Sequence, residues 1–369
     1  MYSDPELLIE ETNDRGTMYA IVEQDNRTAY FYLYPSEIMG NRFKPRPCWL
    51  RNLLPAPEKK DIAAMKDGVA PMLEVRYCNH PEGKEKLEKE RISFIWNAEG
   101  DGAAMLYDGE ILGIIPGWGL YSDEPAAYAA DCTDGGEDSI TFPLGTPETN
   151  GQYRKFLDAA GFWDSWDDAE NPQWPAIQEK FLQTYEAHFG TETAYYAIDG
   201  DKWPPMAIGK YEKDNIVYLA TMGMSIRPMP WVEFLYNDNA AAYRRAELAI
   251  ALDKQYFNEE QIMQIGQQLA GLADRPWKIV TWLGEGHTVS SSVLPAPYES
   301  LILSSALYNG PQLDMPEMYG DKVNLYWAVP VTFEEREYAQ SIPNGGYQLL
   351  EEMINAGLNH IVTLRDALK

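Results

Sequence analysis

Residues 323–340 read VNLYWAVPVTFEEREYAQ, and this stretch predicts a strand joined directly to a helix. Its first nine residues are rich in the β-branched and aromatic side chains that favour strands. Thr332 and Glu335 then have the spacing of a capping box, in which both side chains accept hydrogen bonds from backbone N–H groups at the start of a helix. We therefore expect the chain to change from strand to helix at Thr332.

Other strands and helices are predicted before and after this stretch. Apolar runs of strand composition occupy residues 215–224, 231–236, 246–252, 277–283 and 298–305. Apolar residues at helical spacing predict a helix whose face ends at Phe189, a second helix over 259–273, and a third whose apolar stripe stops at Gly357. Strands and helices thus mix without regular β-α-β alternation, which favours an α+β fold.

The first 150 residues alternate short β-rich runs with turn signals. Strands are predicted at 17–22, 28–34, 91–97 and on both sides of the Asp108-Gly109 pair. An Asp-Gly pair between apolar runs predicts a two-residue hairpin, because both central positions of a type I′ turn need a positive φ. A Pro-rich segment at 44–57 and a charged run at 82–91 are expected to be loops, the second with room for a short helix. Mainly antiparallel sheet is expected here.

The composition changes between residues 147 and 175. A short apolar helical face is followed by FWDSWDDAENPQWP at 162–175, which is acidic and rich in tryptophan. This change predicts a domain boundary near residue 170. Residues 1–170 are expected to form a β-rich α+β domain, and residues 171–369 a second domain. The whole chain is predicted to be α+β, with mixed, largely antiparallel sheets flanked by helices.

The charge balance restricts the class of partner. The 57 acidic and 30 basic residues give a formal net charge of −27 at pH 7, which repels nucleic acid and anionic membranes and favours basic partners. The same charge also serves simply to keep a protein soluble.

No apolar run is long enough to span a bilayer, and the N-terminus, MYSDPELLIEE, is acidic where a signal peptide is basic. A cytoplasmic protein is expected.

The side chains that commonly carry catalysis or bind metals form no recognised motif. The best enzymatic candidate is GEGHTVSSS at 284–292, but it contains no GxSxG or SxxK nucleophile motif, so His287 is expected to be a turn or strand residue. The cysteines Cys48, Cys78 and Cys132 are widely spaced and are expected to be free, buried thiols. The four histidines are scattered as well. No catalytic residue, metal or cofactor is predicted.

Four strings in the second half carry a family resemblance. They are ATMGMSIRPM at 220–229, RAEL at 245–248, GHT at 286–288, and the stretch from 323 with the Gly-rich connection and helix after it. Their ordered combination resembles the Suppressor of fused domain, from about residue 174 to residue 365. The resemblance implies a protein-binding module rather than an enzyme.

What the resemblance implies about partners depends on the type of family member. An animal member holds an extended peptide of a Gli transcription factor between its two domains. This chain ends soon after the resembling region and has an unrelated N-terminal half, so Gli binding is not implied. For bacterial-type members the resemblance implies immunity proteins that neutralise toxins of interbacterial competition.

The same strings also have a physical interpretation. Gly223 is expected to allow a sharp turn after a strand, and the methionines beside it are expected to fill the core. Arg245 and Glu247 lie two residues apart and should share one face of a strand. Glu247 is therefore expected to pair across the sheet with a basic neighbour.

The junction near residue 170 is the predicted partner-binding site. Aromatic and acidic side chains alternate there, and the residues concerned are Trp163, Asp164, Trp166, Asp167, Asp168 and Trp174. An acidic surface rimmed by aromatic rings suits a basic protein, such as a nuclease toxin. The competing interpretations are a packed interdomain linker at this segment, a cytoplasmic adaptor that binds an extended peptide on a sheet edge, and an uncharacterised hydrolase that uses His287.

Overall fold

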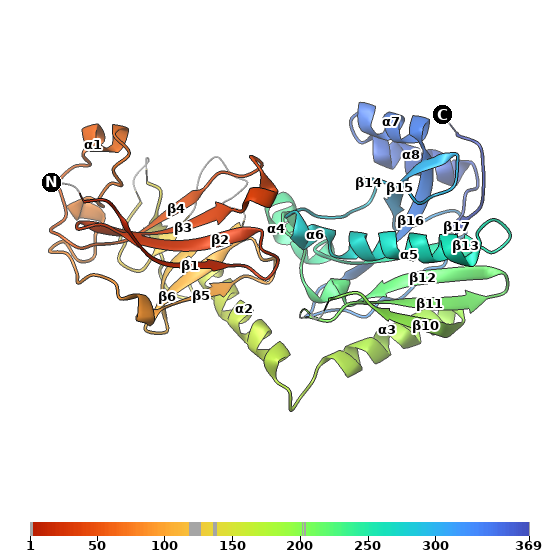
Figure 1. Cartoon of the computed structure of the whole chain (residues 1–369), viewed down its shortest axis with the longest axis horizontal. Coiled ribbons are helices and arrows are strands. Elements are labelled where there is room, and N and C mark those ends of the chain that lie inside the picture. The colour runs from red at the N-terminus through yellow and green to blue at the C-terminus, as the bar shows by residue number, and fades with distance from the viewer. Residues whose placement is uncertain (1–2, 118–126, 136–138, 201, 203, 369) are drawn as a thin grey trace. The chain divides into compact units, whose positions relative to one another are not determined.

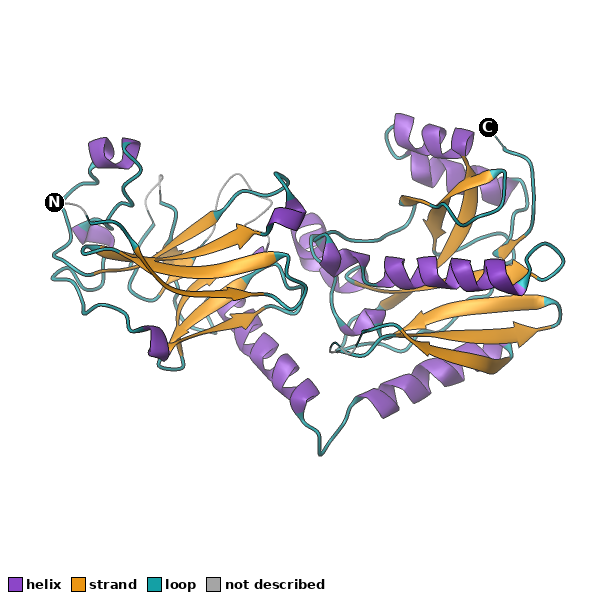
Figure 2. Ribbon diagram, in the orientation of Figure 1, coloured by secondary structure: helices purple, strands orange, loops and turns teal. Residues whose placement is uncertain are grey.

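Two units make up the chain. The structure is a computed structural model that describes residues 3–117, 127–135, 139–200, 202 and 204–368. Residues Met1–Asp167 and Trp277–Val280 belong to the first unit, and Asp168–Pro276 and Thr281–Lys369 belong to the second. Both units combine sheets with helices, as Figures 1 and 2 show, so the predicted α+β class is confirmed.

The first unit is built on two sheets. A four-stranded antiparallel sheet follows chain order, with strands β1 (Glu6–Thr12), β2 (Met18–Gln24), β3 (Thr28–Pro35) and β4 (Arg46–Asn52). A five-stranded sheet also follows chain order, with strands β5 (Ile92–Trp96), β6 (Ala103–Tyr107), β7 (Glu110–Ile115), β8 (Tyr128–Ala129) and β9 (Phe142–Pro143). Only the last described pair, β8 with β9, is parallel in these two sheets. The unit's helices are α1 (Ile62–Lys66) and α2 (Gly151–Asp167).

Helix α2 packs on the five-stranded sheet. Phe156 of α2 is fully buried and packs in one cluster with Ile111 and Ile114 of β7.

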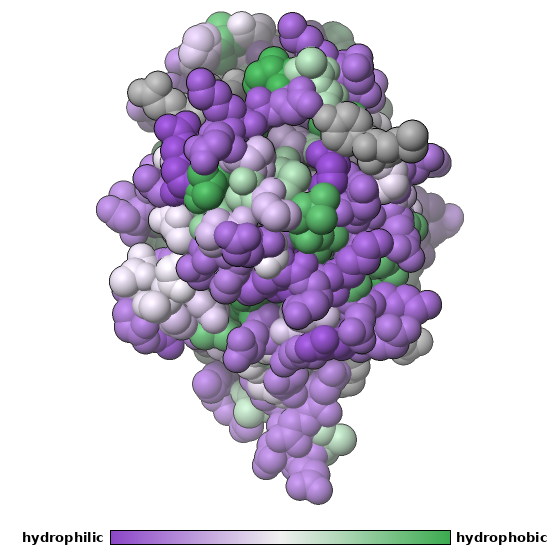
Figure 3. All heavy atoms as spheres, turned by 90° about the vertical axis from the view of Figure 1, so that its left-hand side faces the viewer, coloured by the Kyte–Doolittle hydropathy of each residue, from purple (hydrophilic) through white to green (hydrophobic). Residues whose placement is uncertain are grey.

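Hydrophilic residues cover most of the face that Figure 3 shows, and the hydrophobic residues on it are scattered. This distribution is ordinary for a protein surface.

The hairpin prediction in this unit is confirmed, and one loop prediction is wrong. Asp108 and Gly109 have φ values of 55° and 82°, as a type I′ turn between β6 and β7 requires.

The segment 44–57 is not all loop, because it contains β4. Pro47 lies within β4 opposite Tyr32, and proline is tolerated there because β4 is the last strand of its sheet.

The second unit has one eight-stranded sheet. Its strands are β10 (Thr191–Ala197), β11 (Ala207–Lys213), β12 (Ile216–Met222), β13 (Arg245–Asp253), β14 (Thr288–Ser290), β15 (Tyr298–Ser304), β16 (Val323–Thr332) and β17 (Ile361–Val362). The order is β10-β11-β12-β13-β16-β15-β14, and β17 pairs with β13. β13 runs parallel to β16 and β17, and the other pairings are antiparallel. β10 is therefore one edge of the sheet.

Two long helices cover opposite faces of this sheet. The helices of the unit are α3 (Trp174–Phe189), α4 (Val232–Tyr236), α5 (Glu259–Ala273), α7 (Phe333–Ser341) and α8 (Gly345–Asn355), with α6 (Arg275–Lys278) at the division between the units. Phe189 of α3 stacks on Tyr218 of β12 with ring centroids 4.6 Å apart. The next residue, Leu219, points to the other face and lies against α5. The sheet is thus sandwiched between α3 and α5.

The predicted helices are confirmed here, but two predicted strands are wrong. Residues 231–236 form the short helix α4, and the segment 277–283 contains the end of α6 followed by irregular chain. Apolar runs of six or seven residues fit a buried helical turn as well as a strand. Trp231, with a φ of 71°, sets the turn that leads into α4. The predicted capping box is present, because Thr332 and Glu335 each accept the other's backbone N–H.

Candidate functional site

Four of the six predicted partner-binding residues lie on the last turns of α2. The indole Nε1 of Trp163 donates a hydrogen bond to the carbonyl oxygen of Trp96, 3.0 Å away. Trp166 is buried, whereas Asp164 and Asp167 are exposed. The tryptophans therefore anchor α2 to its own unit, and the two carboxylates face solvent.

The other two predicted residues belong to the second unit. The Asp168 carboxylate accepts hydrogen bonds from the backbone N–H of Glu170 at 3.0 Å and from the side-chain amide of Asn171 at 3.0 Å. Trp174 begins α3, and its ring lies against Gly223, where a Cβ would come within 3.0 Å of it. Both residues thus have local structural roles. Partner binding by the six residues stays a prediction.

The Suppressor of fused-like strings surround a buried carboxylate. Glu247 on β13 is fully buried. Its oxygens accept hydrogen bonds from the hydroxyls of Thr221 at 2.6 Å and Ser225 at 2.7 Å, and from the backbone N–H groups of Gly223 at 2.9 Å and Ser225 at 3.0 Å. The prediction that Glu247 pairs with a basic neighbour is wrong, because neutral donors from the TMGMS turn bind it. Burial raises its pKa, which the donors only partly offset.

The arginine of RAEL, Arg245, binds Asp321 rather than Glu247. Arg245 Nε lies 2.6 Å from Asp321, and Arg244 Nε lies 2.7 Å from the same carboxylate. Arg245 also donates to the carbonyl oxygens of Ser225 and Ile226. Burial alone would raise the pKa of Asp321, but the two guanidinium groups lower it. Glu247 therefore accepts hydrogen bonds from the backbone N–H groups of the turn after β12, and Arg245 donates hydrogen bonds to the carbonyl oxygens of the same turn.

His287 packs against an aromatic ring. Its ring centroid is 4.3 Å from that of Trp282, and burial lowers its pKa, so that the imidazole is neutral at pH 7. The nearby Ser291 hydroxyl donates instead to the side chain of Gln268, 2.6 Å away. This geometry makes His287 a packing residue.

The rings around His287 form what we call the aromatic cluster. Ring contacts link Tyr236, Tyr243, Trp282 and His287. We include Tyr326 and Tyr347, which interact electrostatically with these tyrosines. These residues come from α4, the chain after it, the loop before β14, β16 and α8. No periodicity of the sequence links these segments, so sequence reasoning did not find the cluster.

Glycines allow two of these segments to approach each other closely. Gly286 has a φ of 76°, and a Cβ on Gly346 would overlap the carbonyl oxygen of Gly286. The loop of GHT therefore lies directly on the first turn of α8, next to Tyr347. This close approach explains why a Gly-rich connection accompanies the GHT string.

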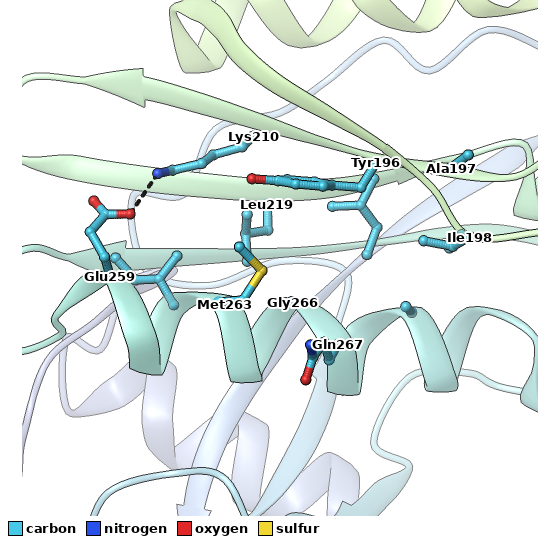
Figure 4. Close-up of a pocket in the computed structure, with 12 residues that line it drawn as sticks. Tyr196, Ala197, Ile198, Lys210, Leu219, Glu259, Met263, Gly266 and Gln267 are labelled. Carbon is cyan, nitrogen blue, oxygen red and sulfur yellow. Dashed lines mark hydrogen bonds and ion pairs between the residues drawn. The ribbon is translucent and has the colours of Figure 1, made fainter.

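A groove lies where α5 meets the edge of the sheet. Its cavity volume is about 260 Å³, and residues of β10, β11, β12 and α5 line it (Figure 4). Tyr196 and Met263 at its rim are 38% and 48% exposed. Lys210 and Glu259 form an ion pair of 2.9 Å beside it. The groove is thus mainly apolar and opens beside the edge strand β10.

The described part of the chain contains no group of three or more histidine, cysteine, aspartate or glutamate side chains placed to hold a metal ion. Within the same residues, no helix is both long and apolar enough to cross a bilayer. The three cysteines are free and buried.

Comparison with known families finds a match over most of the second unit. Residues 202–365 match the family model described as Suppressor of fused protein (SUFU). The match includes the Glu247 site and the aromatic cluster, and it begins after α3 and β10. No curated protein matches the chain. Suppressor of fused proteins are a non-enzymatic family of binding and regulatory proteins. This chain therefore carries a Suppressor of fused domain over residues 202–365, a protein-interaction module.

Proposed function

We propose that this protein inhibits a basic toxin protein of bacterial origin by binding to its surface, without a catalytic step. The observation that carries the proposal is a protein-interaction module in a chain with a formal net charge of −27. A nuclease toxin must attract phosphate groups and so presents a basic surface. Complementary charge accelerates the encounter and selects such a partner.

The exposed carboxylates of α2 are the proposed first contact for this partner. Asp164 and Asp167 point to solvent at the end of the helix, while Trp163 and Trp166 fix the helix on its sheet. A rigid support keeps the charges in place without an ordering cost on binding. An inhibitor gains both rate and selectivity from such an arrangement.

Reversing these charges is expected to slow association with the toxin. We expect the double variant Asp164→Lys and Asp167→Lys to lower the association rate about tenfold at low salt, with little change in dissociation. The partner is first recovered by co-expression with the products of neighbouring genes and pull-down. Rates are then measured by surface plasmon resonance at two salt concentrations.

A matched control separates this site from net charge alone. Glu37→Lys with Glu58→Lys makes the same change in charge at two exposed positions of the same unit. Equal slowing by both double variants would remove α2 from the proposal but keep the inhibitor function. Failure to recover any partner, together with failure to protect growth, would contradict the function itself.

The groove at the sheet edge favours a second function, that of an adaptor for extended peptides. Ile198 donates its backbone N–H to Met206, so the alternation of an antiparallel pair turns the backbone groups of Tyr195 and Ala197 toward the outer edge of β10. A peptide strand can add to such an edge and place an apolar side chain in a neighbouring pocket.

A charge in the groove is expected to weaken peptide capture. Met263→Asp should weaken binding of extended, leucine-containing peptides at least about tenfold, because the carboxylate would lose water on contact with the apolar side chain. Peptides selected from a displayed random library are measured by fluorescence anisotropy. Gln264→Asp places the same charge on the same helix outside the groove lining and is expected to bind normally. Equal binding by both variants would exclude the groove.

A further inference from the structure

We propose that the aromatic cluster and Glu285 together bind one arginine side chain of a basic protein partner. The inference rests on the proposed function, because it names the group on that partner that the second unit recognises. Its support comes from the ring geometry, the exposure of the rings, and the charges beside them.

The rings present several aromatic faces and edges within a small area. Tyr236 stacks on Tyr243 with centroids 4.3 Å apart and an interplanar angle of 24°. Trp282 meets Tyr236 edge to face at 5.6 Å and His287 at 4.3 Å. A cation is attracted when it lies over such a ring within about 6 Å of the centroid. Contiguous rings allow one cation to contact more than one of them.

The outer rings of the cluster are accessible to a partner. Tyr243 is 40% exposed and Tyr347 is 51% exposed, whereas Tyr326 is buried. An aromatic ring with this much exposure offers apolar area that no residue of its own unit covers. Exposed tyrosines of this kind are favoured at the centres of protein interfaces.

Glu285 supplies the negative charge. Its carboxylate accepts hydrogen bonds from the hydroxyl of Ser304 at 3.3 Å and from the backbone N–H of Ser305 at 2.6 Å. The next residue, Gly286, lies against the backbone of Gly346 and Tyr347, where a Cβ would come within 3.2 Å of both, and this contact places the charge close to the cluster. Because the donors to Glu285 are neutral, its charge is not cancelled by them.

The basic residues around the cluster do not compete for it. His287 is neutral at pH 7, since burial lowers its pKa. Arg244 and Arg245 follow Tyr243 in the chain, but Asp321 binds both guanidinium groups. The cluster therefore combines aromatic rings and a carboxylate, and the described basic residues that adjoin it in the chain are neutral or bound to Asp321.

Arginine fits this combination better than lysine. Its planar guanidinium stacks on aromatic rings and also donates in a fork to a carboxylate, and it gives up water more readily than an ammonium group. A basic toxin surface offers arginine side chains of this kind. The occupant is thus an arginine on a folded partner.

The probe for this site is the pentapeptide Gly-Ser-Arg-Ser-Gly, compared with the same peptide containing citrulline, which keeps the shape and lacks the charge. Binding to the full chain is followed by the NMR signal of the Trp282 indole, assigned with the variant Trp282→Phe. We expect the arginine peptide to shift this signal to saturation and the citrulline peptide to leave it in place. Tyr347→Leu and Glu285→Gln should each weaken binding about fivefold.

The control is Tyr308→Leu, which makes the same change at a tyrosine of the same unit that is 48% exposed and lies outside the cluster. It is expected to bind the arginine peptide normally. Equal shifts with both peptides, no shift with either, or equal weakening by Tyr308→Leu and Tyr347→Leu would overturn the proposal. Thermal unfolding of each variant verifies that it is folded.

The two proposals fail in different ways. If the toxin binds Tyr347→Leu as tightly as the unchanged protein, the arginine site is wrong and the inhibitor function stands. If the arginine peptide binds as expected but no toxin is recovered and growth is not protected, the site stands and the inhibitor function is wrong.

Discussion

Replacing Glu247 by alanine is expected to lower the free energy of unfolding of the second unit by about 4 kcal/mol. The fully buried carboxylate accepts four hydrogen bonds from Thr221, Gly223 and Ser225, and its removal leaves these donors without an acceptor inside the protein. Each unsatisfied buried donor costs about 1–3 kcal/mol, and the sum is reduced by relaxation of the turn. Urea unfolding followed by tryptophan fluorescence measures the effect.

Two further variants make this result specific. Glu247→Gln keeps the size and one acceptor oxygen of the side chain, so a loss of about 2 kcal/mol is expected. Glu299→Ala removes an exposed carboxylate from the nearby strand β15 and should change stability by less than about 0.5 kcal/mol. If Glu247→Ala were no worse than Glu299→Ala, the carboxylate would not hold the turn.

The pH dependence of the same site has a definite sign. Burial raises the folded-state pKa of Glu247 above its usual value of 4.5. The part of the stability that comes from this difference in pKa is therefore complete below pH 4.5 and is lost as pH rises through the folded pKa. The advantage of the unchanged protein over Glu247→Gln is expected to be largest in acid and to shrink above that value.

In the second unit, the strands that the sequence predicts correctly have a nearly uniform character along their length. β12, β13, β15 and β16 are nearly continuous apolar runs because they are buried in the middle of a sheet. β10 was missed because it is an edge strand, with the mostly exposed and mixed sequence TETAYYA. The apolar run at 231–236 was misassigned for the opposite reason, since its composition fits a helical turn equally well.

The contacts of the site were harder to predict than its location. The strings TMGMS and RAEL indicate the correct part of the second unit. The period-2 spacing of Arg245 and Glu247 favours a basic partner for Glu247, whereas its actual donors, Thr221 and Ser225, lie in the other string. Their short hydroxyl side chains and the turn at Gly223 were the available signal. The aromatic cluster depends on segments brought together by β13, β16 and α8, and only the tertiary fold reveals it.

Replacing Arg365 by alanine is expected to destabilise the second unit by about 3 kcal/mol. Arg365 binds Glu335 through two hydrogen bonds, of 2.5 and 2.9 Å, and the Glu335 side chain has no exposed area. Removing the guanidinium leaves a buried carboxylate that keeps only its backbone donors, among them the N–H groups of Thr332 and Leu368. Urea unfolding at pH 7 measures the loss.

The pH dependence of this pair runs opposite to that of Glu247. Burial would raise the pKa of Glu335, but Arg365 and the backbone donors outweigh it and lower the pKa below 4.5. The stabilisation is present above pH 4.5 and disappears as pH falls through the folded pKa, so Arg365→Ala should differ less from the unchanged protein in acid. Lys322→Ala removes an exposed positive charge and is the control. A loss of equal size in that variant, or one that does not shrink in acid, would mean that the Glu335–Arg365 pair is not the source of the stability.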